Sequence, residues 1–350
     1  MYPLFDAHCD APTEIFRKNE DLLSNSGHVD IKRLLAFKNP AQVFAVWLDP
    51  KLPREGGAFE SAARIISFFG EQIVKYKDFI SRVTSPEDLA ACAGTGKIAA
   101  LLAVEGGEPL EGKLENLSKL REMGVCSITL TWNDQNELGC GCLGGEAGLT
   151  PFGFEALREA RRLGMTVDIS HLSEAGCRDV LGACKAPVIA SHSNAAALCR
   201  NKRNLSDEII RDIAEKGGVV GATLYPPFLA EAKVASIPDV LRHVNYMVNL
   251  AGAEHVGLGC DFDGIEQTPA DLRDLSAMPR LLYALELMLG AETAEKVASK
   301  NFFRVFMETL KTSPGEKSPA AEFSTASLEI SAASVGSSAK KRKKIMRNWF

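Results

Sequence analysis

The 350-residue sequence contains no long hydrophobic run and no basic stretch followed by an apolar segment at its beginning. A spanning helix requires about 20 consecutive apolar residues, and a secretory leader requires a basic and then an apolar region. We therefore expect neither a membrane segment nor a leader. Basic charge is not in excess either, because 40 Lys and Arg stand against 45 Asp and Glu, for a net charge of -5. This balance disfavours nucleic acid and anionic membranes as partners and favours a small molecule.

The sequence also has no cysteine framework, and no dinucleotide-binding glycine motif follows its first apolar runs. Its nine cysteines are odd in number and have no repeated spacing, so they do not predict a set of disulfides. We expect a reducing compartment and a cytoplasmic protein. No Gly-x-Gly-x-x-Gly turn follows an early apolar run, which argues against an open sheet that binds a dinucleotide.

Short apolar runs rich in Val, Ile, Leu and Ala alternate with longer amphipathic stretches. Buried parallel strands joined by helices have this pattern. The expected strands are residues 4–8, 42–47, 98–105, 127–131, 166–171, 187–192, 218–223 and 256–261. Eight strand-helix units favour a (β/α)8 TIM barrel of the α/β class, whose active site lies at the carboxyl ends of the strands.

The composition changes near residue 311. Residues 312–350 contain eight serines, six alanines and a basic run at 340–344, without helical or strand periodicity. We expect a barrel domain at 1–311 and a disordered Ser/Ala-rich tail at 312–350. The basic run is compatible with a nuclear address or an anion-binding patch, and equally with a solvated tail.

Metal-ligand residue types stand at the carboxyl ends of the expected strands. These residues are the histidines His8, His171 and His192 and the acids Asp10, Glu105 and Asp261. Imidazoles and carboxylates together form the ligand set of zinc and similar first-row ions. Because strand ends converge at one barrel mouth, the pattern predicts a metal centre there.

The spacing of His8 and Asp10 has a geometric consequence. Alternate residues of a strand point to the same side, so both side chains face the barrel interior while Cys9 faces away as a packed thiol. The ligand candidates outnumber the three protein groups of a single catalytic zinc. A two-metal site with a bridging carboxylate is therefore expected, and Glu105, which lies between the two groups in the chain, is the expected bridge.

The sequence resembles the membrane dipeptidase (renal dipeptidase) family of zinc peptidases, in the form of a bacterial-type soluble member. The resemblance spans about residues 4–308. It rests on six ordered motifs, which are Phe5-Asp6-Ala7-His8-Cys9-Asp10, Val104-Glu105-Gly106-Gly107, Asp168-Ile169-Ser170-His171, Ser191-His192-Ser193-Asn194, Arg203-Asn204-Leu205-Ser206-Asp207 and Gly259-Cys260-Asp261-Phe262-Asp263-Gly264. The resemblance implies an amidohydrolase-type barrel with two Zn²⁺ ions per chain.

The resemblance also implies roles for individual residues. One zinc would be held by His8 and Asp10 and the other by His171 and His192, with Glu105 as the bridge. Asp261 would move the proton from the nucleophilic water to the leaving amine. Arg203 would grip the terminal carboxylate of a dipeptide through two parallel hydrogen bonds.

One position departs from the mammalian members of that family. Trp132 stands where they carry a histidine near the substrate carbonyl, and an indole N–H donates one hydrogen bond but holds no charge. We expect Trp132 and the following Asn133 to contact substrate, with Asn133 supplying the missing polar contact.

The sequence thus predicts a dizinc dipeptidase, extending to dipeptides with a carboxyl-terminal D-residue. The alternatives are a related metal-dependent amidohydrolase that acts on a lactam, lactone or N-acyl amino acid, and a barrel without catalysis that serves as a scaffold through its basic tail. A homodimer is left open as the assembly state.

Overall fold

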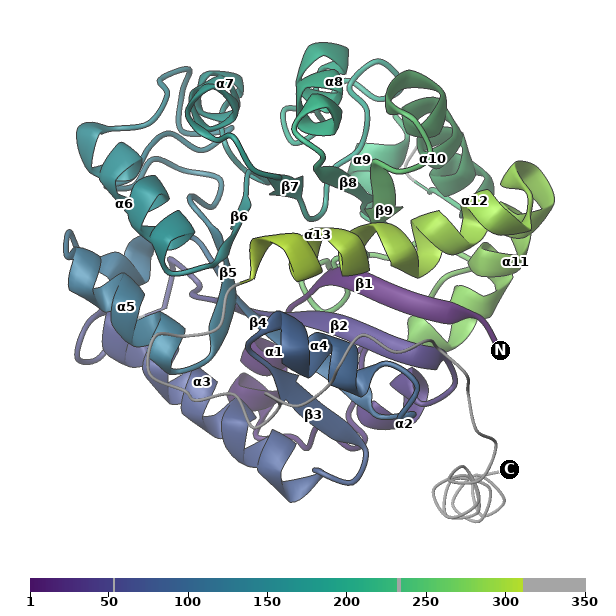
Figure 1. Ribbon diagram of the computed structural model, residues 1–350, viewed down its shortest axis with the longest axis horizontal. Helices are drawn as coiled ribbons and strands as arrows, with labels where there is room; N and C mark the ends of the chain where they lie inside the picture. The colour runs from purple at the N-terminus through teal and green to yellow at the C-terminus, as the bar shows by residue number, and fades with distance from the viewer. Residues whose placement is uncertain (53, 232–233, 311–350) are drawn as a thin grey trace, which may run out of the picture. The chain divides into compact units, whose positions relative to one another are not determined.

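A closed barrel of parallel strands forms the centre of the molecule, with helices around it (Figure 1). The computed structural model describes residues 1–52, 54–231 and 234–310. Nine strands form the sheet, namely β1 (Pro3–Cys9), β2 (Lys38–Trp47), β3 (Ile80–Val83), β4 (Ile98–Glu105), β5 (Val125–Thr129), β6 (Thr166–Asp168), β7 (Ile189–Ala190), β8 (Val219–Ala222) and β9 (Val256–Leu258). The expected α/β barrel is confirmed.

Pairing between β2 and β4 closes the barrel. The register runs from Ala41 opposite Ala99 to Trp47 opposite Glu105, so the two strands pair along seven residues. The ninth strand, β3, was not expected, and it pairs only with the first half of β4. The second half of that edge of β4 pairs with β5. Eight strands therefore form the ring, and β3 is an additional short strand outside it.

Amphipathic helices cover the outside of the ring because each has one apolar face. In α8 (Asp207–Glu215), for example, Ile209, Ile210 and Ile213 are buried against the barrel. The helices include α3 (Ala58–Lys75), α5 (Leu114–Glu122), α6 (Pro151–Arg162), α7 (Glu174–Ala183), α10 (Ile237–Ala251) and α11 (Met278–Leu289). Shorter helices are α1 (Ala11–Lys18), α2 (Ile31–Leu34), α4 (Pro86–Cys92) and α9 (Pro226–Leu229).

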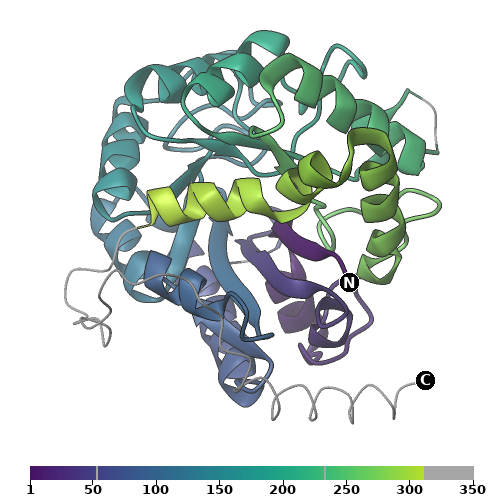
Figure 2. The same ribbon diagram turned by 45° about the vertical axis from the view of Figure 1, so that its right-hand side comes forward.

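The amino-terminal end of the barrel is closed by α13 (Asn301–Thr309), which runs across the strands in Figures 1 and 2. Its Phe302 and Phe306 stack on Phe5 of β1, with ring centroids 6.0 and 5.4 Å apart. A single π-turn at Lys296–Lys300 separates α13 from α12 (Ala291–Glu295), where the sequence pattern predicts one continuous helix. Aromatic side chains fill the amino-terminal end of the barrel, so a functional site is expected at the opposite, carboxyl end of the strands.

One expectation concerns residues that the structure does not describe, and a second needs correction. The predicted tail at 312–350 lies outside the described residues, so the division into two domains stays a prediction. The strands β5, β6, β7 and β9 end at residues 129, 168, 190 and 258, two or three residues earlier than expected. Within residues 1–52, 54–231 and 234–310, no helix is long and apolar enough to cross a membrane.

Candidate metal and substrate site

The predicted ligands meet at the carboxyl mouth of the barrel, although not all of them stand on strands. His8 lies in β1 with Asp10 just beyond it, and Glu105 is the last residue of β4. The shorter strands place His171, His192 and Asp261 in the loops that follow β6, β7 and β9. Two of the six residues, His8 and Glu105, therefore stand on strands, and the other four lie just beyond strand ends.

A cleft of about 610 Å³ opens over these residues. Its wall includes Asp10, Glu105, Trp132, Asn133, His171, Arg203 and Asp261. The volume accommodates a small molecule, and the polar groups converge at its floor, as in other ligand cavities.

The first group of ligand atoms belongs to Glu105, His171 and His192. The Nε2 atoms of the two imidazoles lie 2.8 Å apart. Glu105 Oε1 lies 2.8 Å from His171 Nε2 and 3.4 Å from His192 Nε2. All three side chains are buried, so three potential ligand atoms face one another away from solvent.

The other nitrogen of each ring has its own partner, which determines the tautomer. His171 Nδ1 lies 2.8 Å from the carboxamide oxygen of Asn133, which only accepts hydrogen bonds. His192 Nδ1 lies 2.7 Å from Ser191 Oγ, and the Ser191 hydroxyl donates its proton to Asp168. Both Nδ1 atoms must therefore carry the hydrogen, and each Nε2 presents a lone pair.

These lone pairs fit a bound cation. Burial, with the positive Arg203 nearby, lowers the pKa of His171 and of His192 well below the usual value, so both rings are neutral. Neutral imidazoles and a carboxylate are the ligand forms that zinc and similar ions bind. Three acceptors in contact repel one another, and a cation between them removes that repulsion.

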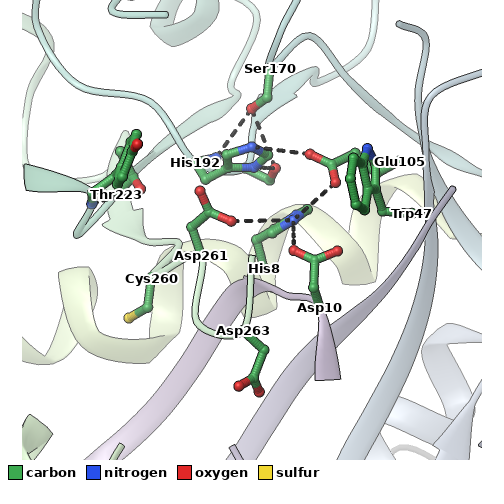
Figure 3. A network of polar contacts seen from close by, with 12 residues as sticks. His8, Asp10, Trp47, Glu105, Ser170, His192, Thr223, Cys260, Asp261 and Asp263 are labelled. Atoms are coloured by element: carbon green, nitrogen blue, oxygen red, sulfur yellow. Dashed lines mark hydrogen bonds and ion pairs between the residues drawn. The ribbon is translucent and has the colours of Figure 1, made fainter. Parts of the chain in front are cut away.

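The second group belongs to His8, Asp10 and Asp261, which Figure 3 shows around the His8 ring. His8 Nε2 lies 3.3 Å from Asp10 Oδ2, 3.7 Å from Glu105 Oε2 and 3.9 Å from Asp261 Oδ1. Neither His8 Nε2 nor Asp10 Oδ1 has a hydrogen-bond partner, although both are buried. Buried polar atoms without partners are rare, so this group also fits an ion.

Electrostatics at the second group favour positive charge. Burial lowers the pKa of His8, but the carboxylates of Glu105 and Asp10 outweigh burial and raise it to about 10. Burial raises the pKa of Glu105 well above its usual range and that of Asp261 to about 7. Three crowded carboxylates in a buried place require cations for full ionisation.

Asp168 is a residue that sequence reasoning did not assign to the site. It is near His8 and His192, but four donors already occupy its carboxylate, namely the backbone amides of Ser170 and Ser191 and the hydroxyls of Thr129 and Ser191. It therefore orients Ser191 and, through it, His192. Its place three residues before His171 in a buried strand was the available signal.

Two ligand candidates have unusual backbone conformations. His171 and Asp261 have φ values of 69° and 62°, in the left-handed region that non-glycine residues seldom adopt. The surrounding loops hold these conformations, which turn both side chains into the mouth. A Cβ at Gly264 would overlap Asp10 Oδ2 and lie 2.5 Å from Asp261 Oδ1, so only glycine leaves room for the two carboxylates.

Arg203 lies in the same cleft and is buried rather than solvated. Its NH2 group donates to the His192 carbonyl at 3.1 Å, and its guanidinium carbon lies 5.5 Å from the centre of the Phe228 ring. Its Nε has no partner. The guanidinium is thus held in place while part of its donor capacity is unused.

Trp132 and Asn133 both line the cleft. The Trp132 ring lies 5.2 Å from Trp47 and 6.1 Å from His171 by centroids, so it forms part of an aromatic wall. The carboxamide oxygen of Asn133 is committed to His171, an orienting contact that the sequence analysis did not anticipate. Cys9 and Cys260 are buried free thiols in the hydrophobic layer, as expected for Cys9, and Figure 3 shows Cys260 directed away from His8.

An α/β barrel with imidazoles and carboxylates converging at its mouth defines a metal-dependent hydrolase. The family model described as membrane dipeptidase, peptidase family M19, matches residues 1–319. The chain therefore belongs to the membrane dipeptidase family and is a metallopeptidase that hydrolyses dipeptides.

Two fungal relatives are similar over most of the chain. An uncharacterized dipeptidase of Schizosaccharomyces pombe is 34% identical over 302 residues, covering 81% of this chain and 73% of its own. Dipeptidase aclJ of Aspergillus oryzae is 34% identical over 304 residues, covering 81% of this chain and 72% of its own.

Solved structures agree with the fold. A metallo peptidase from Rhodobacter sphaeroides, liganded with a phosphinate mimic of the dipeptide L-Ala-D-Ala, has a TM-score of 0.82 at 26% identity, over 88% of this chain and 99% of that chain. An amidohydrolase from Pseudomonas aeruginosa has a TM-score of 0.75 at 24% identity, over 88% and 97% of the two chains, and shares the fold.

Proposed function

We propose that this dipeptidase uses two zinc ions. His171 and His192 would hold one ion, His8 and Asp10 would hold the other, and Glu105 would bridge them. The observation that carries the proposal is the 2.8 Å approach of two neutral imidazole Nε2 atoms beside Glu105. The carboxylate of Glu105 faces both groups, with Oε1 toward His171 and Oε2 toward His8.

Two bound zinc ions would supply Lewis acidity for the scissile carbonyl and lower the pKa of the attacking water. Asp261 would take a proton from the attacking water and return it to the leaving amine, a role supported by its place in the cleft, with Oδ1 3.9 Å from His8 Nε2. Such proton transfer is required because an amine anion is too basic to depart.

Arg203 binds the terminal carboxylate of the substrate. Its guanidinium is oriented by the His192 carbonyl and by Phe228 and has a donor without a partner. A planar guanidinium in a cleft matches a carboxylate. Trp132 forms the apolar wall against which the dipeptide lies, and Asn133 also lines that wall.

The substrate class extends to dipeptides with a carboxyl-terminal D-residue. The similar Rhodobacter protein binds a mimic of L-Ala-D-Ala, which supports this choice. We further propose a reducing, cytoplasmic location, because all nine cysteines are buried free thiols. Light scattering of the purified chain would distinguish a monomer from the homodimer left open above.

Elemental analysis and a substrate panel test the proposal together. The purified protein should contain about two metal ions per chain, and zinc should restore activity after chelation. L-Ala-L-Ala and L-Ala-D-Ala should both be cleaved, while the amide of L-Ala-L-Ala should be a much poorer substrate. One ion per chain at full activity would contradict the two-metal assignment, and equal cleavage of the amide would contradict the role of Arg203.

A further inference from the structure

His243 is a buried titratable residue that lies outside the metal site. It stands in the middle of α10 and its side chain is 0% exposed. The other buried residues of α10, which is described in full, are Val240, Val244 and Met247, so His243 is the one polar side chain on an apolar helix face. A histidine among apolar residues is stable only if both ring nitrogens have partners.

Both ring nitrogens do have partners, and the partners belong to two different loops. The backbone amide of Ala195, in the loop after β7, donates to His243 Nδ1 at 3.2 Å. His243 Nε2 then carries the ring hydrogen and donates to the Leu229 carbonyl at 3.0 Å, at the end of α9 after β8. One neutral imidazole therefore joins the two loops.

These two loops together form the surroundings of Arg203. Ala195 pairs with Leu205 as an isolated bridge, which ties together the two sides of the loop that carries Arg203. Leu229 follows Phe228, whose ring faces the guanidinium. The Phe228 carbonyl accepts a hydrogen bond from the Asn204 side chain at 2.9 Å, so the two loops also meet beside the arginine.

We propose that His243 is a positioning residue that sets the affinity of the Arg203 pocket for the substrate carboxylate. It holds the loop of Arg203 and the segment of Phe228 at a fixed separation, so that the guanidinium stays between the His192 carbonyl and the aromatic ring. Displacement of either loop would misalign the two parallel hydrogen bonds between the Arg203 guanidinium and the substrate carboxylate, and such a pair tolerates little movement. The inference rests on the proposed role of Arg203 in binding that carboxylate.

Metal binding should not depend on His243. The His192 ring is held through its own chain of hydrogen bonds to Ser191 and Asp168, and His171 is held by Asn133. A loss confined to carboxylate recognition is therefore the expected result of changing His243. An effect on carboxylate binding without an effect on metal binding would distinguish the positioning of Arg203 from a disturbance of the whole site.

Two variants with opposite expectations test the inference. His243→Gln keeps an acceptor and a donor at similar separation, and it should retain the wild-type KM. His243→Leu removes both and leaves the Ala195 amide buried without a partner, while Arg242 still donates to the Leu229 carbonyl at 3.0 Å. This variant should raise KM for L-Ala-L-Ala roughly tenfold, with kcat and metal content close to wild type.

The same variants are measured with the carboxyl-terminal amide of the dipeptide and beside Arg203→Ala. KM for the amide should not change in His243→Leu, because the amide lacks the group that the pocket binds. Equal effects on acid and amide, or loss of bound metal, would overturn the inference. If Arg203→Ala raises KM and His243→Leu does not, only the role of His243 fails. If Arg203→Ala has no effect, the carboxylate assignment fails and the inference fails with it.

If His243→Leu does not yield folded protein, His243→Asn replaces it. The shorter carboxamide reaches one of the two partners, so an intermediate rise in KM is expected, with metal content again unchanged. A wild-type KM in this variant would also overturn the inference.

Discussion

The Nε2 atoms of His171 and His192 lie 2.8 Å apart, and the Nδ1 atom of each ring is already committed to a hydrogen bond. Two lone pairs at this distance, with Glu105 Oε1 beside them, repel each other unless a cation lies between. The pair therefore links metal binding to the stability of the folded chain.

Removal of metal should lower the thermal stability as well as the activity. A ligand that binds only the folded state at 100 times its Kd stabilises that state by about 2.7 kcal/mol. Differential scanning calorimetry before and after chelation should show a lower Tm without metal, and added zinc should restore it. An unchanged Tm, with metal loss verified by elemental analysis, would contradict this expectation.

Replacement of Ser191 by alanine should weaken metal binding. The serine hydroxyl accepts from His192 Nδ1 and donates to Asp168, so its loss frees the imidazole to change tautomer and rotate. Mutation of a residue that hydrogen-bonds to a metal ligand typically lowers the affinity for the metal about 10–100-fold. Competition with a chromogenic chelator measures the change. Ser67→Ala, at an exposed position of α3, is the matched control and should leave the affinity unchanged.

The meeting of His8, Asp10, Glu105, His171, His192 and Asp261 at one mouth could be predicted from the sequence because each residue stands at or just beyond the end of an apolar run. Their roles as metal ligands stay a proposal. Asp168 and Ser191 could not be assigned in this way. Their contact joins the last residue of β6 to the loop after β7, 23 residues further along the chain, and it depends on where the strands end. Those ends were predicted two or three residues too late at β5, β6, β7 and β9, since the residues that follow these strands are also mostly buried.

The barrel itself was predictable from eight apolar runs, but its closed end was not. The spacing of Phe302 and Phe306 indicates an apolar helix face without indicating which surface it covers. Strand β3, with four residues, is too short for periodicity to distinguish it from a loop. Both features depend on contacts between distant segments, which a local pattern does not contain.

Phe306→Ala should destabilise the protein without changing its chemistry. Phe306 is fully buried at the closed end of the barrel, and its ring stacks on Phe5. Truncation of a buried phenylalanine costs about 3–5 kcal/mol, through lost burial and the cavity left behind. Urea unfolding measures the loss, and kcat at low temperature should match the wild type. Phe303→Ala, at a less buried position of α13, should cost less.

Stability should depend on pH through His243. Burial lowers the pKa of this histidine, whereas in the unfolded chain its pKa is about 6.5. The unfolded state therefore binds more protons as the pH falls below about 6.5, so the contribution of neutral His243 to stability is lost toward acid. Wild type should lose stability relative to His243→Gln between pH 8 and pH 5, measured by urea unfolding.

The comparison with His243→Gln isolates this one group. The other buried histidines and the neighbouring charges of Asp239 and Arg242 are the same in both proteins. A difference in stability that stays constant from pH 8 to pH 5 would contradict the buried, neutral state of His243.

Asp261→Asn should abolish most of the turnover while the metal stays bound. Asparagine fits the left-handed conformation at this position, where φ is 62°, but it cannot accept a proton. Loss of a general acid-base residue costs about 10²–10⁴-fold in rate. The proposed ligands His8, Asp10 and Glu105 are retained, so elemental analysis should show wild-type metal content. Glu266→Gln removes an exposed carboxylate from the rim of the same cleft and should keep kcat near wild type. A loss of metal in parallel with activity would assign Asp261 to ligation instead of proton transfer.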